Sequence, residues 1–313
     1  MECTPGGRVA GMTIALGTIP FGTTVDEPTS FAILDRFVDA GGTIIDTADN
    51  YPFWLDGATG DESETTIGRW LASRRNRDQV VISTKVGGRP TVPGDRTLGS
   101  AEGLSAAAVR AAMEGSLRRL GVDGVDVYWA HIEDRSVPLE ETVAVFGELV
   151  REGRARQLGA SNHATWRLDR ARALAAARGL TPYTHVQLRH SYLRPRPGVR
   201  LPEGGHVQVS EETLDYVRSE GLALWVYTSL LAGAYARKPL PEHYDHPGTT
   251  RRLAVLREVA DELGATPNQV VLAWLRAQDV VPIVGVSSLA QLDELLAEVK
   301  LEPAQIARLD APA

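Results

Sequence analysis

The sequence predicts a (β/α)8 barrel, in which eight parallel strands alternate with eight helices. Short β-branched or apolar runs alternate with longer amphipathic segments from one end of the chain to the other. About eight such pairs fit into 313 residues, a usual length for this fold. The alternative is an open, doubly wound sheet, but the chain contains no G-x-G-x-x-G phosphate turn. These observations favour the closed barrel.

The alternation can be followed element by element. The strand candidates are residues 13–19, 43–46, 80–85, 125–131, 155–160, 185–188, 223–227 and 281–284. The helix candidates between them are residues 28–39, 62–73, 106–120, 139–151, 165–177, 211–219, 251–263 with 267–277, and 289–299. Because each helix carries the chain back across the sheet, successive strands are expected to run parallel.

Capping signals support several of these helix boundaries. A side chain that can accept a hydrogen bond from the first helical amides is expected at Ser105, Thr165 and Thr266, and Pro267 suits a first helical turn. Glycines that favour a left-handed stop follow three helices, at Gly179, Gly221 and Gly264.

Four long irregular segments follow predicted strands, at residues 52–61, 87–103, 189–209 and 232–250. In a barrel, the segments that follow strands gather at one rim, where such folds place their chemistry. No linker or shift in composition divides the chain, so we expect one domain over residues 1–313.

Composition excludes several classes of protein. The chain is 43% hydrophobic and carries a net charge of −7, which disfavours nucleic acid and anionic membrane surfaces as partners. No signal peptide or apolar stretch of bilayer length is present. The single cysteine, Cys3, has no partner for an intrachain disulfide, which suits a reducing compartment. We therefore expect a cytoplasmic protein.

Lys85 is unusual because only three of the 33 basic residues are lysines. It ends an apolar, strand-like run, Val80-Val81-Ile82-Ser83-Thr84-Lys85. A buried ammonium can change the pKa of a neighbour from a compact point, whereas an arginine needs a wide planar slot. Taken alone, this lysine could equally face water at the end of a strand.

Three further polar residues stand at or just after the ends of predicted strands: Asp46, Tyr51 and His131. Adjacent strands lie about 4.8 Å apart, so these side chains can meet Lys85. The ammonium would stabilise the Tyr51 phenolate, Asp46 would compensate the buried charge, and His131 would hydrogen-bond a carbonyl oxygen. The set is a proton relay suited to reducing a carbonyl group, with Asp46, Tyr51, Lys85 and His131 as its catalytic residues.

The ordered set resembles the aldo-keto reductase family, and the resemblance covers nearly the whole chain. It is carried by Asp46, Tyr51, Lys85 and His131 together with Leu16-Gly17-Thr18, Gly159-Ala160-Ser161-Asn162, Gln187, Tyr227-Thr228-Ser229-Leu230, and the segments 282–288 and 291–294. It implies an NAD(P)H-dependent reductase of aldehydes or ketones, in which a hydride leaves nicotinamide C4 while Tyr51 protonates the oxygen.

The resemblance also implies where the nucleotide binds. The nicotinamide carboxamide would be held by Ser161, Asn162 and Gln187, and the ring would stack on Tyr227. The phosphates would lie near Thr228, Leu230 and Gly285, and the adenosine near Ser287, Ser288, Gln291 and Glu294. Gly17 and Thr18 complete the residues expected at the cofactor.

Two positions depart from the pattern of the family. Many relatives have Lys or Arg where Ser287 stands, to pair with the 2′-phosphate of NADP, and many have Asn where Leu295 stands. A phosphate without a cationic partner binds less well, which weakens the case for a strict NADP preference. NADPH remains the expected cofactor, with NADH as the alternative.

Aromatic residues near the predicted rim are candidates for the substrate pocket: Phe21, Phe53, Trp54 and Trp129. Trp129 shares strand parity with His131 and could equally fill the barrel core. We expect a small-molecule carbonyl substrate, with a keto-sugar or a natural-product carbonyl as candidates. The resemblance implies a monomer.

The sequence fits other functions less well. The remaining histidines show no metal-ligand spacing, so no metal is expected. No nucleophile-elbow motif is present, which excludes a hydrolase of that type. A nucleotide-sensing regulatory subunit on the same barrel is the alternative to an enzyme, and a Schiff-base lyase that uses Lys85 is a third hypothesis.

Overall fold

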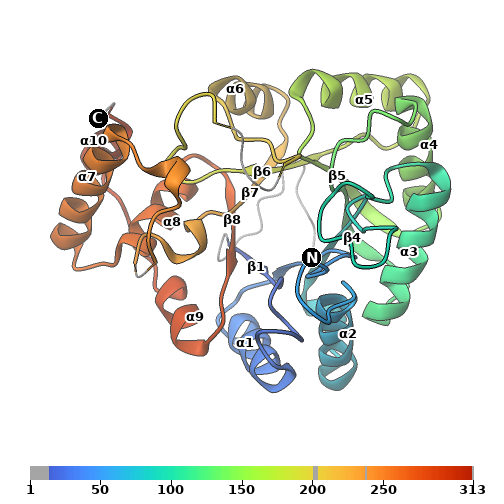
Figure 1. The fold of residues 1–313 in the computed structure, drawn as a ribbon, viewed down its shortest axis with the longest axis horizontal. Helices are drawn as coiled ribbons and strands as arrows, with labels where there is room; N and C mark the ends of the chain where they lie inside the picture. Colours follow the sequence, from blue (N-terminus) through green and yellow to red (C-terminus); the bar gives the residue numbers. More distant parts are fainter. Residues whose placement is uncertain (1–13, 200–203, 237, 312–313) are drawn as a thin grey trace.

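The protein is described by a computed structural model that covers residues 14–199, 204–236 and 238–311. Eight parallel strands close into a barrel in the order of the sequence, and helices surround it (Figure 1). The predicted (β/α)8 barrel is thereby confirmed. The strands are β1 (Ala15–Gly17), β2 (Ile44–Asp46), β3 (Val81–Val86), β4 (Val125–Ala130), β5 (Ala155–Ser161), β6 (His185–Arg189), β7 (Ala223–Tyr227) and β8 (Val281–Gly285).

The helices follow the strands as the parallel order requires. They are α1 (Glu27–Asp39), α2 (Glu62–Arg74), α3 (Ala106–Leu120), α4 (Leu139–Arg151), α5 (Thr165–Ala177), α6 (Glu211–Ser219), α7 (Pro247–Leu263), α8 (Pro267–Ala277), α9 (Leu289–Leu296) and α10 (Pro303–Asp310). Short 3-10 turns lie at Arg77–Gln79, Leu231–Gly233 and Glu242–Tyr244.

Most of the predicted caps form, and one does not. Ser105 accepts from the Ala108 amide, and Thr266 accepts from the Gln269 amide with proline at the first turn. Thr165 is instead the first residue of α5, and its side chain makes no cap bond. The Ala164 amide donates to the Glu133 carboxylate at 2.8 Å, so the loop after β4 supplies an acceptor at the start of α5 in place of a local side chain.

Two helices at the carboxyl end differ from the prediction. α7 begins at Pro247 rather than at residue 251, and α10 was not predicted. α10 packs against α7 and α8, where the Trp274 Nε1 donates to Asp310 at 2.7 Å and Leu309 is fully buried (Figure 1). Tertiary contacts thus stabilise α10, which at eight residues is too short to be stable as a helix by itself. Thr13, the predicted start of the first strand, and Cys3 lie outside the described residues.

The core has two parts. The larger part fills the space between the barrel and its helices, and includes Phe21. The smaller part fills the inside of the barrel and consists of Ala15, Ile44, Val127, Trp129, Trp225 and Ile283. Trp129 and Trp225 pack with their ring centroids 5.3 Å apart. The barrel is therefore solid below its rim, and a ligand can reach only the mouth.

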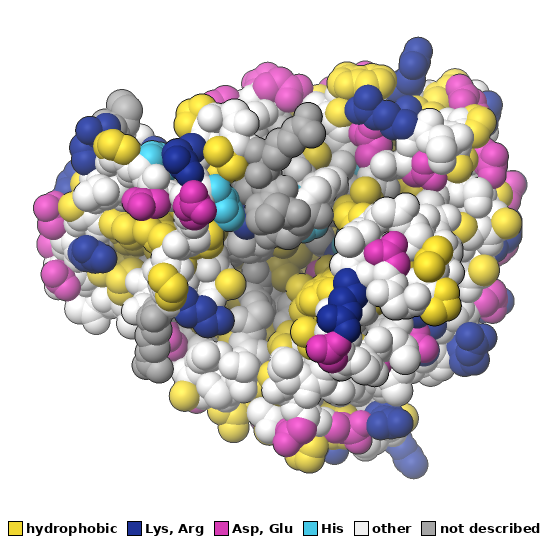
Figure 2. All heavy atoms as spheres, viewed as in Figure 1, with side chains coloured by type: hydrophobic (Ala, Val, Ile, Leu, Met, Phe, Trp, Pro, Cys, Tyr) yellow, Lys and Arg dark blue, Asp and Glu magenta, His cyan; other side chains and the backbone are white. Residues whose placement is uncertain are grey.

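Figure 2 shows this face of the molecule hollowed above the barrel, with hydrophobic side chains along the hollow. Three loops converge at the mouth, because Gly205 of the loop after β6 lies against Leu98 of the loop after β3 and Ile132 of the loop after β4. Among the helices of the described ranges, none is both long and apolar enough to cross a bilayer.

Candidate active site

Lys85 and Asp46 form a buried ion pair at the ends of β3 and β2. Lys85 is fully buried, and its Nζ lies 2.7 Å from Asp46 Oδ2. The same Nζ donates to the Thr47 carbonyl at 2.6 Å. Strand pairing places Asp46 of β2 opposite Ser83 of the neighbouring β3. Lys85 lies two residues beyond Ser83, and its long side chain extends to the carboxylate. The ammonium is held from two directions and does not point into solvent.

Tyr51 lies directly over this ion pair. Lys85 Nζ is 4.8 Å from the centre of the Tyr51 ring, and the ring centroids of Tyr51 and His131 are 5.8 Å apart. The backbone hydrogen bonds between β3 and β4 continue to His131, whose amide donates to the Val86 carbonyl at 2.8 Å. The structure thus brings together the four residues that the sequence predicts as catalytic.

Burial and neighbouring charges act in opposite directions on the pKa values of Tyr51 and Lys85. Burial raises the pKa of Tyr51 above 10.0; Lys85 acts to lower it, while Asp46 acts to raise it. Burial acts to lower the pKa of Lys85, but the charge of Asp46 and the nearby Tyr51 outweigh it, and the net pKa is raised above 10.5. Lys85 therefore acts in the predicted direction on the phenol, although burial has the larger effect before any ligand is bound.

His131 is held as a neutral imidazole. Burial lowers its pKa well below 6.5, and the positive charges of Lys85 and His206 lower it further. Its Nδ1 has no hydrogen-bond partner among the described residues. Gly88 lies beside this nitrogen, where a Cβ atom would come within 3.0 Å. A neutral imidazole can donate one hydrogen bond to a carbonyl oxygen without carrying a charge.

Asp46 is supported from below by a chain of hydrogen bonds. Its Oδ1 accepts from Ser83 Oγ at 2.9 Å and from Gln187 Nε2 at 3.1 Å. Trp129 Nε1 in turn donates to Ser83 Oγ at 2.6 Å. Charge-assisted hydrogen bonds of this kind compensate a buried carboxylate for its lost hydration. Trp129 therefore belongs to the support of the ion pair.

The residues expected at the nicotinamide lie together at the ends of β5, β6 and β7. Asn162 has a left-handed backbone (φ 59°), and its Nδ2 donates to Ser161 Oγ at 3.0 Å and to the His131 carbonyl at 3.1 Å. Its Oδ1 accepts from the Tyr227 hydroxyl at 2.6 Å and from the Val207 amide at 3.1 Å. Gln187 lies between them and Asp46.

The residues expected at the phosphates and the adenosine follow β7 and β8. Thr228 has a left-handed backbone (φ 56°), Leu230 is half-buried, and Gly285 is exposed at the end of β8. Ser288 caps α9, and Gln291 Oε1 accepts from the Ser287 amide at 2.7 Å. Glu294 is already engaged by Thr266 Oγ1 (2.7 Å) and Asn268 Nδ2 (3.2 Å). These residues stand at the ends of the neighbouring strands β7 and β8 and at the start of α9.

Four predicted residues lie in the interior instead of facing a ligand. Thr18 is fully buried and donates from Oγ1 to the Asp46 carbonyl at 2.9 Å, while Gly17 is a paired residue of β1. Phe21 and Trp129 are both 0% exposed. Phe21 packs between the barrel and its helices, and Trp129 lies two residues deeper than His131, so neither offers surface to a substrate.

Aromatic side chains continue from the catalytic tyrosine toward the outside. Tyr51 and Trp54 meet edge to face with centroids 6.0 Å apart, and Trp54 meets Phe53 in the same way at 5.2 Å. Phe53 and Trp54 are half-buried. Together with His131, this aromatic ladder forms one wall of the mouth.

His206 is a residue that reasoning from the sequence missed. Its ring lies 5.4 Å from that of Tyr227, centroid to centroid, and its charge acts on His131. It stands in a loop rich in proline and glycine, where no periodicity indicates which side chains turn inward. The bonds of the next residue, Val207, to the Arg189 amide at 3.0 Å and to Asn162 Oδ1 at 3.1 Å place His206 at the mouth.

Asp49 is a fully buried acid beside the catalytic residues, and neither of its oxygens meets a hydrogen-bond donor in the described part of the chain. Burial raises its pKa well above 3.8, Glu102 and Glu64 raise it further, and Arg89 opposes them. Between the unfolded pKa and this raised value, the folded protein binds more protons than the unfolded chain, so the stability of the fold falls as the pH rises through that interval.

We expect Asp49→Asn to remove this pH dependence, because the amide mimics the neutral acid. Relative to the unsubstituted protein, the variant should gain free energy of unfolding progressively from pH 4 to pH 7. Denaturant midpoints measured across that range test this. An equal loss of stability at every pH would show that Asp49 is ionised in the folded state.

Comparison with known proteins is consistent with this geometry. A model of the aldo/keto reductase family matches residues 13–312. The chain is 31% identical over 316 residues to the uncharacterized oxidoreductase YrpG of Bacillus subtilis, covering 96% of this chain and 92% of the relative. It is 30% identical over 310 residues to a norsolorinic acid reductase of Emericella nidulans (92% and 74% covered), and 28% identical over 312 residues to a putative aryl-alcohol dehydrogenase of Saccharomyces cerevisiae (93% and 77% covered). The chain belongs to the aldo/keto reductase family.

Proposed function

We propose that the protein reduces an aldehyde or ketone carbonyl to an alcohol with NAD(P)H, and that Tyr51 is the proton donor. Membership of the family supports a carbonyl oxidoreductase role. The observation that carries the finer proposal is the ammonium of Lys85, 2.7 Å from Asp46 Oδ2 and 4.8 Å from the centre of the Tyr51 ring.

The donor and acceptor set at the strand ends suits a nicotinamide cofactor. Ser161 offers a hydroxyl group and Gln187 an amide for a carboxamide, and Tyr227 offers an aromatic ring beside them. Asn162 already uses its amide within the protein, where it bonds Ser161 and Tyr227 and so orients this set. When bound there, the cofactor supplies a hydride from C4 to the carbonyl carbon.

The residues of the chain complete the reaction at the carbonyl oxygen. Tyr51 gives its proton to the oxygen as negative charge develops there, and the neighbouring Lys85 stabilises the phenolate that remains. Neutral His131 donates a hydrogen bond that orients the oxygen. Asp46 keeps Lys85 in place and protonated.

We propose an uncharged aromatic carbonyl as the substrate. The aromatic ladder of Phe53, Trp54 and Tyr51, together with His131, can contact a flat ring by edge and face. One relative bears a name that agrees with an aromatic substrate, a putative aryl-alcohol dehydrogenase. A keto-sugar has no π face of its own, so its ring can offer these side chains only C–H groups.

A substrate panel tests this function. NADPH oxidation would be followed by absorbance with substituted benzaldehydes, aryl ketones, aliphatic aldehydes of equal size and keto-sugars. We expect kcat/KM to be about tenfold higher for aryl than for aliphatic carbonyls, because each aromatic contact contributes about 0.5–1.5 kcal/mol beyond area burial. Faster turnover of the sugars would contradict the aromatic assignment, and no turnover of any carbonyl would contradict the function.

NADPH is the proposed cofactor, but Ser287 leaves its 2′-phosphate without the cation that many relatives place there. In this structure Ser287 donates to Gln291 through both its amide and its hydroxyl group. We expect Ser287→Lys to lower KM for NADPH about tenfold and to leave KM for NADH unchanged, because a charged hydrogen bond to phosphate is added. Ser287→Ala is the matched control. Equal changes for both nucleotides would place the 2′-phosphate elsewhere.

A further inference from the structure

Two loops at the mouth lie side by side, and each carries part of the catalytic set. The catalytic loop (residues 47–61) joins β2 to α2 and holds Tyr51, whereas the β3 loop (residues 87–105) follows the strand of Lys85. The Asp49 amide donates to the Lys85 carbonyl at 3.2 Å, and Asn50 Nδ2 donates to the Gly88 carbonyl at 2.7 Å. Beyond Asn50, the catalytic loop leaves the strand ladder, and other contacts must fix it.

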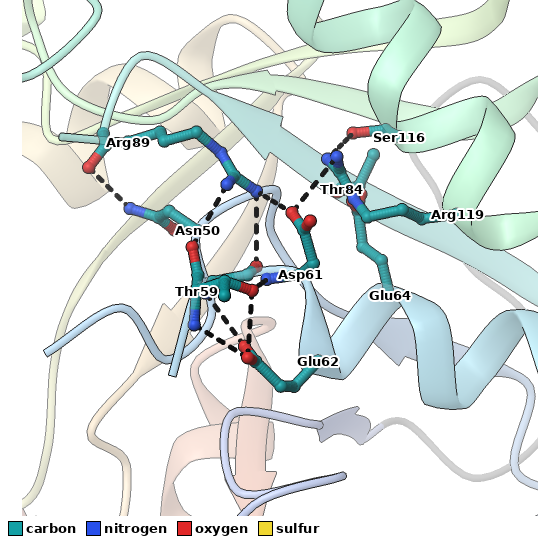
Figure 3. Close-up of polar contacts among 11 residues, drawn as sticks. Asn50, Thr59, Asp61, Glu62, Glu64, Thr84, Arg89, Ser116 and Arg119 are labelled. Atoms are coloured by element: carbon teal, nitrogen blue, oxygen red, sulfur yellow. Dashed lines mark hydrogen bonds and ion pairs between the residues drawn. The ribbon is translucent and has the colours of Figure 1, made fainter. Parts of the chain in front are cut away.

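Arg89 of the β3 loop supplies such contacts. Its guanidinium donates to three successive residues of the catalytic loop: to the Thr59 carbonyl at 3.2 Å, to the Gly60 carbonyl at 3.4 Å and to Asp61 Oδ1 at 2.6 Å. Figure 3 shows Arg89 reaching past Asn50 toward Asp61. A planar fork of donors fixes its acceptors in direction as well as distance.

The segment that Arg89 holds lies directly against the residue before Tyr51. Gly60 has φ 91°, and a Cβ atom there would come within 3.0 Å of the Asn50 Cα. The end of the catalytic loop is thus folded back on its beginning, and the Ser63 amide donates to the Tyr51 carbonyl at 3.4 Å. Holding residues 59–61 in place therefore also holds the backbone at Tyr51.

A second arginine, from α3, contacts the same carboxylate oxygen of Asp61 as Arg89 and links it to buried residues. Arg119 of α3 lies 3.3 Å from Asp61 Oδ1 and donates to Glu64 Oε2 at 2.7 Å. Glu64 is fully buried and accepts from Thr84 Oγ1 at 2.5 Å. Thr84 precedes Lys85 on β3, so the network returns to the strand that carries the ammonium (Figure 3).

We propose that Arg89 is a positioning residue that holds Tyr51 against Lys85 by bridging the catalytic loop and the β3 loop. Lys85 is fixed by a strand and an ion pair, whereas Tyr51 stands on a loop, so the loop contacts set their separation. The inference rests on the proposed role of Tyr51 as proton donor. A displacement of about 1 Å at such a group can cost about a hundredfold in rate.

The test compares Arg89→Ala and Arg89→Lys with Arg96→Ala. Arg96 pairs with Asp56 between the same two loops, but both side chains are exposed, so it is the matched control. We expect Arg89→Ala to lower kcat about 10- to 100-fold and to leave KM for NADPH unchanged, because the cofactor residues lie on β5–β8. Arg89→Lys should recover part of the loss, and Arg96→Ala should match the unsubstituted protein.

A second readout does not depend on turnover. Each protein is titrated with base while phenolate absorbance is recorded. The same titration of that protein with Tyr51→Phe added is then subtracted, which leaves the absorbance of Tyr51. Because the net effect of the folded site raises the pKa of Tyr51 above 10.0, loosening the loop should let it fall toward that value in Arg89→Ala.

The outcomes are distinguishable. An unchanged kcat and an unchanged Tyr51 titration in a folded Arg89→Ala protein would overturn the proposal, as would equal effects of Arg89→Ala and Arg96→Ala. If Arg89→Ala does not fold, Arg89→Lys carries the same comparison. If the unsubstituted protein turns over no carbonyl but the Tyr51 titration shifts as expected, the positioning role stands and the proposed function fails.

Discussion

Tyr51→Phe is expected to lower kcat/KM for carbonyl reduction by about 10²–10⁴-fold, the usual contribution of a positioned acid. The substitution removes one oxygen from a buried ring and keeps the ring contacts with Trp54 and His131. Without the hydroxyl, no proton reaches the carbonyl oxygen from the side of Lys85. Initial rates of NADPH oxidation with an aryl aldehyde measure the effect, and nucleotide binding, followed by quenching of tryptophan fluorescence, should stay the same.

Tyr183→Phe is the matched control for this experiment. Tyr183 is a second buried tyrosine, but it packs against Phe146 between the barrel and its helices, away from the mouth. Its loss of a hydroxyl group should leave turnover unchanged. Wild-type rates in Tyr51→Phe would exclude Tyr51 as the acid, and equal losses in both variants would point to a general effect on folding.

Lys85→Met should abolish turnover and also destabilise the protein by about 3–5 kcal/mol. Removing the ammonium leaves the Asp46 carboxylate buried without its ionic partner, and this cost is typical for breaking a buried pair from one side. It also leaves the Thr47 carbonyl without its donor. The free energy of unfolding from denaturant titration and the rate of NADPH oxidation measure the two effects separately.

The double variant Asp46→Asn, Lys85→Met separates stability from chemistry. With both charges gone, we expect most of the lost stability to return, because no uncompensated charge remains in the interior. Activity should not return, since nothing stabilises the phenolate of Tyr51. Recovery of turnover in the double variant would show that the ammonium serves only to balance Asp46.

The loss of stability in Lys85→Met should depend on pH in one direction. The pKa of Lys85 is raised above 10.5, because Asp46 and Tyr51 outweigh the opposing effect of burial. Its contribution to stability is therefore complete below the unfolded pKa and is lost as the pH rises through the folded value. The difference in unfolding free energy between the unsubstituted protein and Lys85→Met should narrow above about pH 10.5.

The polar residues at the strand ends could be predicted from the sequence because a short segment contains both the strand pattern and the polar residue. A run such as residues 80–85 combines β-branched residues with a terminal lysine, and the parallel order of the barrel then places it beside Asp46 and His131. The same reasoning left Trp129 undecided between the substrate pocket and the barrel core, and it assigned Phe21 to the pocket although Phe21 is fully buried. Alternation shows on which side of a strand a residue lies, but the depth of Trp129 in the barrel and the outward turn of Phe21 depend on packing with distant residues.

The conformations of the loops and the partners within the charge networks could not be predicted from the sequence. His206 reaches the mouth because the following residues, Val207 and Val209, pair with Arg189, and Arg89 reaches Asp61 across a separation of 28 residues. Asp49 reads as a polar loop residue, yet it is fully buried and its pKa is raised. In each case, the partner is brought near by the closed barrel and not by adjacency along the chain.

By itself, the sequence determined the barrel and the identity of the four residues proposed as catalytic, because period, parallel order and residue type are properties of short segments. Only the tertiary structure decided the depth of each side chain, the net direction of the pKa of Tyr51 and the contacts that hold its loop. Those depend on burial and on distances between charges that come from different strands. Such distances exist only after the barrel has closed.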